Sequence, residues 1–194
     1  ALVQGFLAQL RANGGTATTQ AGIPAIRRDG PRWTLLTPSG EFSCDAVVNA
    51  AGAWADEVAS LAGVGPLGLE PRRRTALTVD PPSPHDTSDW TLTIDVDERF
   101  YFKPEAGRLL LSPADETLSP PCDAQPEELD VALAIDRIQQ VAELPVTRVH
   151  ARWAGLRTFA PDRTFVIGEE PRADGFFWLA GQGDYGVQSC AGVA

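Results

Sequence analysis

The sequence is poor in the residues that most often build metal and disulfide sites. It has three cysteines, Cys44, Cys122 and Cys190, and two histidines, His85 and His150. No C-x-x-C pair occurs, and no second histidine stands at the spacing of a metal ligand. We therefore expect no metal site. Three cysteines that are far apart and odd in number fit a reducing cytoplasm better than a disulfide framework.

Long apolar runs and an excess of basic residues are missing as well. No stretch reaches the ~18 uninterrupted apolar residues that a membrane-spanning helix needs. Lysine and arginine number 16 against 26 acidic residues, which gives a net charge of −10. Because proteins that bind nucleic acids normally carry a basic stripe, that class is disfavoured, and the short run Arg72–Arg74 does not change this.

The residues that are present predict a globular protein with many turns and short strands. Hydrophobic residues make up 43% of the chain, which also has 18 glycines and 16 prolines. Helical periodicity predicts helices over 2–10, 54–61 and about 126–142, and a further helix that starts near residue 186. Strand-like runs occur at 16–20, 33–37, 42–50, 75–79, 90–94, 99–102, 109–112, 164–168 and 176–180.

The order of these elements predicts two kinds of structure in one chain. Segments 1–68 and 153–194 contain a strand followed by a tight turn and a helix, which indicates an α/β arrangement. Segment 69–152 contains several short strands and one covering helix, which indicates an antiparallel lobe. We therefore expect an α/β domain with an inserted antiparallel β lobe, an α+β arrangement.

Two turns rich in small residues follow predicted strands. Gly181–Gly186 matches G-x-G-x-x-G, but Asp184 lies inside it and would repel a pyrophosphate, and no ribose-binding acid follows about 20 residues on. We therefore disfavour an NAD-dependent dehydrogenase and expect a glycine turn that approaches another part of a cofactor. The turn Asn49–Gly52 lies where α/β sheets place ligands, although helix–strand packing explains it equally well.

Arg157 is the most informative single residue. It follows the apolar run Trp153–Leu156, where an unpaired guanidinium would be costly, so it needs a carboxylate partner. That partner is either a protein acid or a substrate, and the sequence leaves both open. Tyr101 is either a phenolic donor or a half-buried strand aromatic. Ser189 lacks a G-x-S-x-G context, which disfavours a serine hydrolase.

Several segments together resemble one enzyme superfamily. The run Val47–Trp54, V-V-N-A-A-G-A-W, and the run Trp153–Arg157, W-A-G-L-R, followed by Pro161-Asp162 and Val166–Gly168, resemble the D-amino-acid oxidase, glycine oxidase and sarcosine oxidase superfamily. Segments 101–107, 125–130 and 175–178 are most similar to D-arginine dehydrogenase-like D-amino-acid dehydrogenases. The resemblance covers essentially the whole chain.

The resemblance implies FAD as the cofactor, bound by the α/β pieces 1–68 and 153–194, with lobe 69–152 covering the substrate. It implies that Arg157 and Arg74 clamp the substrate carboxylate, that Tyr101 and Gln188 contact the substrate, and that the backbone at Gly155 lies near the amine. The cofactor-lining residues that it implies are Ile23, Asn49, Ala50, Ala51, Gly52, Trp54, Gly181, Gln182, Gly183, Asp184, Tyr185, Gly186 and Val187.

The implied reaction is hydride transfer from Cα of a D-amino acid or related amine to flavin N5. The imine product would then hydrolyse to the 2-oxo acid. Since the first helix has no N-cap residue and the superfamily's N-terminal fingerprint is not found, we expect a C-terminal portion without its N-terminal FAD-binding segment. The alternative is an isolated substrate lobe, or a non-catalytic remnant, that binds no FAD by itself. Asp184 stands where relatives usually have glycine.

Overall fold

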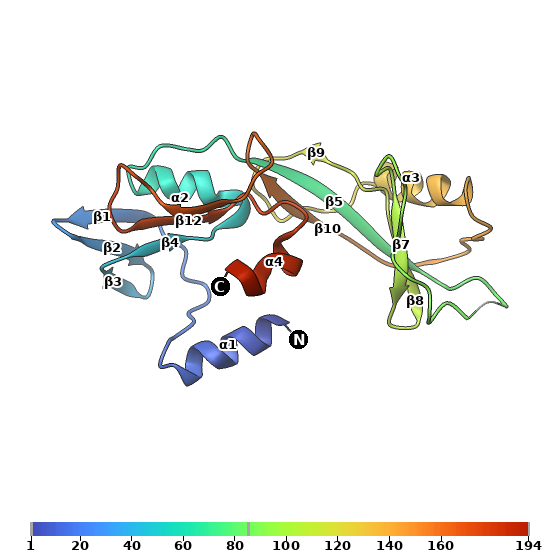
Figure 1. Ribbon diagram of the computed structural model, residues 1–194, viewed down its shortest axis with the longest axis horizontal. Helices are drawn as coiled ribbons and strands as arrows, with labels where there is room; N and C mark the ends of the chain where they lie inside the picture. The colour runs from blue at the N-terminus through green and yellow to red at the C-terminus, as the bar shows by residue number, and fades with distance from the viewer. Residues whose placement is uncertain (1, 85, 194) are drawn as a thin grey trace.

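The computed structural model describes residues 2–84 and 86–193. The molecule is elongated, and two lobes lie at opposite ends of a pair of long antiparallel strands (Figure 1). These strands are β5 (Glu70–Val79) and β10 (Val149–Phe159). The combination of a small α/β part with antiparallel sheets confirms the predicted fold class.

The α/β lobe contains two three-stranded sheets. The first is an antiparallel meander, and the second has the order β11-β12-β4, in which β4 and β12 run parallel. Trp33, Phe176 and Trp178 fill the core between the elements, with ring centroids 5.8 and 5.3 Å apart. The elements are β1 (Ala25–Asp29), β2 (Arg32–Thr37), β3 (Gly40–Cys44), β4 (Val47–Asn49), a 3₁₀ turn (Gly52–Trp54), α2 (Ala55–Leu61), β11 (Val166–Glu169) and β12 (Phe176–Ala180).

The antiparallel lobe has the strand order β10-β5-β8-β7-β6, and β9 pairs with β5. Leu77, Leu109 and Leu111 are fully buried beneath α3, whose Ala134 and Ile138 are equally buried. The apolar stripe predicted for this helix therefore faces the sheet. The elements are β6 (Thr93–Ile94), β7 (Tyr101–Glu105), β8 (Arg108–Ser112), β9 (Thr117–Leu118) and α3 (Glu128–Gln139).

Two helices stand at the periphery. The predicted first helix is present as α1 (Leu2–Ala12), but none of its residues is buried, and Val3 is 68% exposed. Figure 1 shows α1 apart from the sheets, connected to β1 by an extended segment. Helix α4 (Gly186–Val193) follows the glycine loop and also buries no residue. No helix within residues 2–84 and 86–193 is long and apolar enough to cross a membrane.

Several strand predictions were wrong, for physical reasons. Residues 16–20 form no strand, since β-branched residues alone do not make one without a hydrogen-bonded neighbour, and Gln20 has a φ of 56°. The run 42–50 breaks at residues 45–46, where the chain leaves β3 to pair with β12. Strands β1 and β10 were not predicted, and the runs at 90–94 and 99–102 are shifted in β6 and β7.

Candidate functional site

The two predicted turns lie side by side because β4 and β12 are parallel. Asn49 at the end of β4 pairs with Trp178, so the turn after β4 and the loop after β12 leave the same edge of the sheet. The carboxyl ends of parallel strands are where α/β sheets place ligands. Segments more than 120 residues apart are thereby brought to one edge.

Two clefts open at this edge. The larger has a volume of about 420 Å³ and is lined by Ala50–Trp54, Cys122–Ala124 and Ala154–Leu156. The smaller has a volume of about 250 Å³. Ala50, Gly52 and Leu156 line both clefts. The smaller cleft is otherwise lined by Arg157, Thr158, Leu179, Ala180, Gly181, Gln182, Gly183 and Gly186.

The turn after β4 is built by the side chain of Asn49. Asn49 is 2% exposed, its amide Nδ2 donates to the Ala55 carbonyl at 2.8 Å, and its Oδ1 accepts from the Ala51 N–H at 3.3 Å. Gly52 has a φ of 56°, and a Cβ there would meet no atom within 4 Å. The polar side chain therefore shapes the turn, and small residues leave the clefts open.

The glycines of the loop after β12 are required by contacts inside the protein. Gly183 has a φ of 49°, and a Cβ at this position would overlap the Phe159 ring. The Gly183 N–H donates to the Thr158 carbonyl at 2.9 Å, which fixes the loop against the end of β10. The second glycine of the G-x-G-x-x-G pattern is thus required by packing against β10, apart from its proximity to a cleft.

The paired strands β5 and β10 bring the predicted arginines together. Arg74 lies opposite Gly155, and Arg72 lies opposite Arg157. Since residues directly opposite in an antiparallel pair and residues two apart on a strand share a face, these side chains project from the same side of the sheet. A Cβ at Gly155 would meet nothing within 4 Å, so space remains open between the two arginines.

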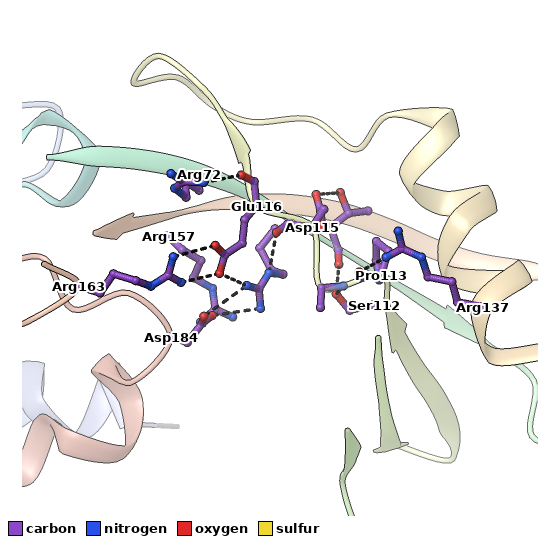
Figure 2. A network of polar contacts seen from close by, with 12 residues as sticks. Arg72, Ser112, Pro113, Asp115, Glu116, Arg137, Arg157, Arg163 and Asp184 are labelled. Carbon is purple, nitrogen blue, oxygen red and sulfur yellow. Dashed lines mark hydrogen bonds and ion pairs between the residues drawn. The ribbon is translucent and has the colours of Figure 1, made fainter. Parts of the chain in front are cut away.

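Both arginines reach the same protein carboxylate. Arg157 Nη1 and Arg74 Nη1 each lie 3.1 Å from Asp184 Oδ1. Arg74 Nη2 also donates to Asp184 Oδ2 at 3.3 Å. Figure 2 shows Arg157 and Asp184 facing one another. The carboxylate partner that the sequence demands for Arg157 is therefore a protein acid in this structure.

A second acid, Glu116, was not predicted. It accepts two hydrogen bonds from Arg163, at 3.0 and 2.8 Å, and a third from Arg74 Nη2 at 3.3 Å (Figure 2). The hydrogen bonds from Arg163 hold the pKa of Glu116 below its usual value, although partial burial opposes them. The only signal in the sequence was an acidic pair, Asp115-Glu116, soon after an apolar strand.

The neighbouring Asp115 has the opposite environment. Burial raises its pKa, although the backbone N–H and the hydroxyl of Thr75 donate to its carboxylate at 2.6 and 2.9 Å. Its own carbonyl accepts from Arg74 Nε at 2.9 Å. Asp115 therefore fixes the position of the Arg74 side chain through its backbone.

Arg73 points to the other face of β5 and serves the antiparallel lobe. Its guanidinium pairs with Glu127, and with Asp130 of α3 at 2.8 Å, while Asp115 lies 3.8 Å away. Burial alone would lower the pKa of Arg73, but the hydrogen bonds and charges of Glu127 and Asp130 raise it. Its side chain is 12% exposed, and its ion pair with Asp130 links β5 to α3.

Other predicted site residues make no polar contact with the arginine pair within the described residues. Tyr101 is half-buried on β7 opposite Ser112, and Gln188 is exposed on α4; within the described chain neither side chain makes a hydrogen bond to Arg74 or Arg157. Ile23 packs against the core of the α/β lobe. Trp54 lines the larger cleft and is 43% exposed, whereas Tyr185 and Val187 are 55% and 78% exposed.

The expectation that the protein has no metal site rests on its few histidines and cysteines. His150 Nε2 lies 2.6 Å from Asp80, and His85 lies outside the described residues. In the part of the chain that the structure describes, no group of three or more histidine, cysteine, aspartate or glutamate side chains is arranged to hold a metal ion.

Curated relatives are similar to this chain over most of its length. It is 29% identical over 178 residues to FAD-dependent oxidoreductase domain-containing protein 1 of Xenopus laevis, covering 80% of this chain and 34% of that protein. It is 28% identical over 163 residues to glycine oxidase of Geobacillus kaustophilus, covering 84% of this chain and 42% of that protein. The chain therefore spans less than half the length of these relatives.

Two solved structures also align with most of this chain and with about half of their own length. The crystal structure of glycine oxidase from Geobacillus kaustophilus aligns with a TM-score of 0.74 at 26% identity, over 91% of this chain and 46% of that one. L-proline dehydrogenase from P. horikoshii aligns with a TM-score of 0.81 at 18% identity, over 94% of this chain and 50% of that one, and shares the fold. The family model described as DAO, FAD dependent oxidoreductase, matches residues 1–194, so the chain belongs to the DAO family of FAD-dependent oxidoreductases.

Proposed function

We propose that this chain contributes the substrate clamp and part of the flavin site of an enzyme that oxidises a D-amino acid or a related amine. Glycine oxidase of Geobacillus kaustophilus is among its relatives. When bound, FAD would supply the acceptor, at flavin N5, for the hydride that leaves the substrate Cα. The resulting imine would hydrolyse in water to the 2-oxo acid.

One observation carries this proposal: three distant segments line the smaller cleft. These are the turn after β4, the end of β10 with Arg157, and the loop after β12. The residues fit an aromatic cofactor, because Ala50 and Gly52 present almost no side chain and a Cβ at Gly52 would meet no protein atom within 4 Å. We propose that Ala50–Gly52 and Gly181–Gly186 would hold the flavin mainly through backbone atoms.

Arg157 and Arg74 are the residues proposed to bind and orient the substrate. A guanidinium fork fixes both the position and the direction of a carboxylate, and therefore of the Cα–H bond beside it. Arg157 is the more accessible of the two, with 37% of its side chain exposed against 10% for Arg74. The open space at Gly155 leaves room for the substrate amine next to the backbone.

The clamp is tested by substituting Arg157 in the flavin-loaded enzyme. Because a hydrogen bond to a charged group contributes up to ~3 kcal/mol, we expect Arg157→Leu to lower kcat/KM for amino-acid substrates roughly a hundredfold. Arg28→Leu, which removes an arginine of the α/β lobe that pairs with Asp174 at 3.5 Å, serves as the control. Unchanged kcat/KM in Arg157→Leu would refute the carboxylate role.

Flavin binding is tested separately by a visible absorption spectrum of the purified protein. Bound FAD is expected to give bands in the blue and near-ultraviolet. Ala50→Val, which places a larger side chain at the cleft without replacing a glycine of positive φ, is expected to weaken or abolish these bands. A well-folded but colourless protein, when supplied with FAD, would favour the alternative of a substrate lobe that binds no cofactor by itself.

A further inference from the structure

We propose that Asp184 is an internal substitute for the substrate carboxylate, which a ligand carboxylate must displace to reach Arg157 and Arg74. This inference rests on the proposed function, because it concerns the same arginine pair. Its basis is that the two predicted clamp arginines already share a carboxylate, and that this carboxylate comes from the loop beside the smaller cleft.

Asp184 forms ion pairs with both arginines, but the hydrogen-bond geometry of its carboxylate is poor. Its Oδ1 lies 3.1 Å from a nitrogen of each arginine, yet this buried oxygen has no partner with hydrogen-bond geometry. Its Oδ2 accepts one hydrogen bond, from Arg74 Nη2, at 3.3 Å. The guanidinium of Arg157 is therefore paired with Asp184 in charge but not by a directed hydrogen bond, and a free carboxylate with more freedom of orientation can supply one.

Glu116 shows what a fixed acid looks like in the same cluster. It accepts two hydrogen bonds from Arg163 at 3.0 and 2.8 Å, the two-pronged geometry of a strong arginine–carboxylate pair. Arg163 also lies over the Phe159 ring, 4.2 Å from its centroid. Glu116 therefore remains in place when a ligand arrives, and Asp184 is the weaker competitor.

Displacement needs only a side-chain movement. The backbone on both sides of Asp184 is anchored, by the Gly183 N–H to the Thr158 carbonyl at 2.9 Å and by the Tyr185 N–H to the Gln182 carbonyl at 3.0 Å. Within the described residues the hydrogen bonds and ion pairs of the carboxylate are with arginines alone, and the Asp184 side chain is 29% exposed. Rotation about its side-chain bonds would carry it from Arg157 towards solvent without moving the loop.

Occupation by Asp184 lowers the apparent affinity for every carboxylate ligand. When a binding-competent state is populated only fractionally, the apparent Kd rises by the inverse of that fraction. If the clamp is free for about a tenth of the time, the apparent Kd is about tenfold higher than the intrinsic value. Because this factor is the same for every ligand, a weakly binding anion leaves the clamp to Asp184 at concentrations where a ligand with a two-pronged contact to Arg157 occupies it.

The test is calorimetric titration of propionate, a simple monocarboxylate, into the protein and its variants, with no need for turnover. We expect Asp184→Asn to bind propionate about tenfold more tightly than the wild type. Asp184→Glu restores a carboxylate and is expected to return the affinity towards the wild-type value. Asp174→Asn removes the same charge at a residue whose side chain is 93% exposed in the α/β lobe, and it is expected to change nothing.

The outcomes separate this inference from the proposed function. Equal affinity in the wild type and Asp184→Asn, with binding lost in Arg157→Leu, would overturn the role of Asp184 and leave the clamp intact. Full binding in the double variant Asp184→Asn/Arg157→Leu would refute the clamp itself. Should Asp184→Asn fail to fold, as judged by circular dichroism, Asp184→Ser removes the carboxylate with a smaller side chain and gives the same comparison.

Discussion

The two faces of strand β5 carry adjacent arginines with different surroundings. Arg73 points towards α3, where its charge is matched by Glu127 and Asp130, with Asp115 nearby. Arg74 points to the opposite face and shares its carboxylates with Arg157 and Arg163. The side chains are almost equally covered, at 12% and 10% exposure. Burial therefore does not distinguish the structural arginine from the one proposed to bind a ligand.

The balance of charge distinguishes them. Around Arg73, one arginine meets three acids. On the other side four arginines meet three acids; these are Arg72, Arg74, Arg157 and Arg163 with Glu70, Glu116 and Asp184. A cluster with more cations than anions attracts a further anion, and one with more anions does not. The excess of positive charge on one face only is what a carboxylate substrate requires.

The largest expected effect comes from removing the structural arginine. Arg73→Leu leaves the largely buried Asp130 and Asp115 without their cation, so we expect a loss of about 3 kcal/mol in the free energy of unfolding. Urea denaturation measures this. Arg74→Leu, on the other face, is expected to cost less than half as much, because its acids retain Arg157 and Arg163. Equal losses would break the distinction between the faces.

A smaller loss is expected from Gly183→Ala, in the loop that carries Asp184. The added Cβ overlaps Phe159 and strains a residue with a φ of 49°, which together cost about 2 kcal/mol in the free energy of unfolding. Gly52→Ala also introduces strain, at a φ of 56°, but no clash, and is expected to cost about 1 kcal/mol. Thermal unfolding of both variants compares them. A Gly183→Ala protein as stable as the wild type would contradict the packing of this loop on β10.

The smallest effect is expected in the pH dependence of the free energy of unfolding, through the acid Glu116. Since the pKa of Glu116 is held below its usual value by Arg163, its contribution is present above the ordinary glutamate pKa and is lost as the pH falls through the lowered pKa. Glu116→Gln is expected to lower the free energy of unfolding by about 1 kcal/mol at neutral pH and to flatten its decline in acid. Unfolding measured from about pH 7 to about pH 3 tests this.

Asp115 serves as a control, because its pKa is shifted in the opposite direction to that of Glu116. Burial raises its pKa, so its contribution to stability falls as the pH rises from the ordinary aspartate pKa through the raised one. Asp115→Asn is therefore expected to steepen the acid decline that Glu116→Gln flattens. The same slope in both variants would show that the two neighbouring acids do not differ as the structure indicates.

The sequence predicted the parts of the site that depend on local pattern. The small-residue turn after β4 and the glycine loop after β12 follow from local motifs, whereas the grouping of Arg157 with Arg74 was implied by the resemblance to a family. Glu116 could not be predicted, because its role depends on β8 lying against β5 and on a turn that contains Arg163. Which acid would meet Arg157 also depends on the packing of the tail loop, and no local pattern encodes that.

The same limit applies to the fold. Helices α1 and α3 follow from their periodicity, and the hairpin β2–β3 follows from its turn. Strand β10 was missed because its small and charged residues do not alternate as a half-buried strand does, and it forms by pairing with β5 along its length. Strand β1 likewise depends on its neighbour β2.

The continuous pairing of β5 with β10 from Ala151 to Phe159 limits how the molecule can move. From Ala151 to Phe159 the register with β5 is continuous, and these strands run through both lobes. Domain closure normally uses a few loop residues as a hinge, but bending here would break a ladder of strand hydrogen bonds. We therefore expect the paired strands to keep the two lobes in a fixed relative position. For the proposed clamp, we therefore expect ligand access to depend on side chains and short loops, not on opening and closing of the lobes.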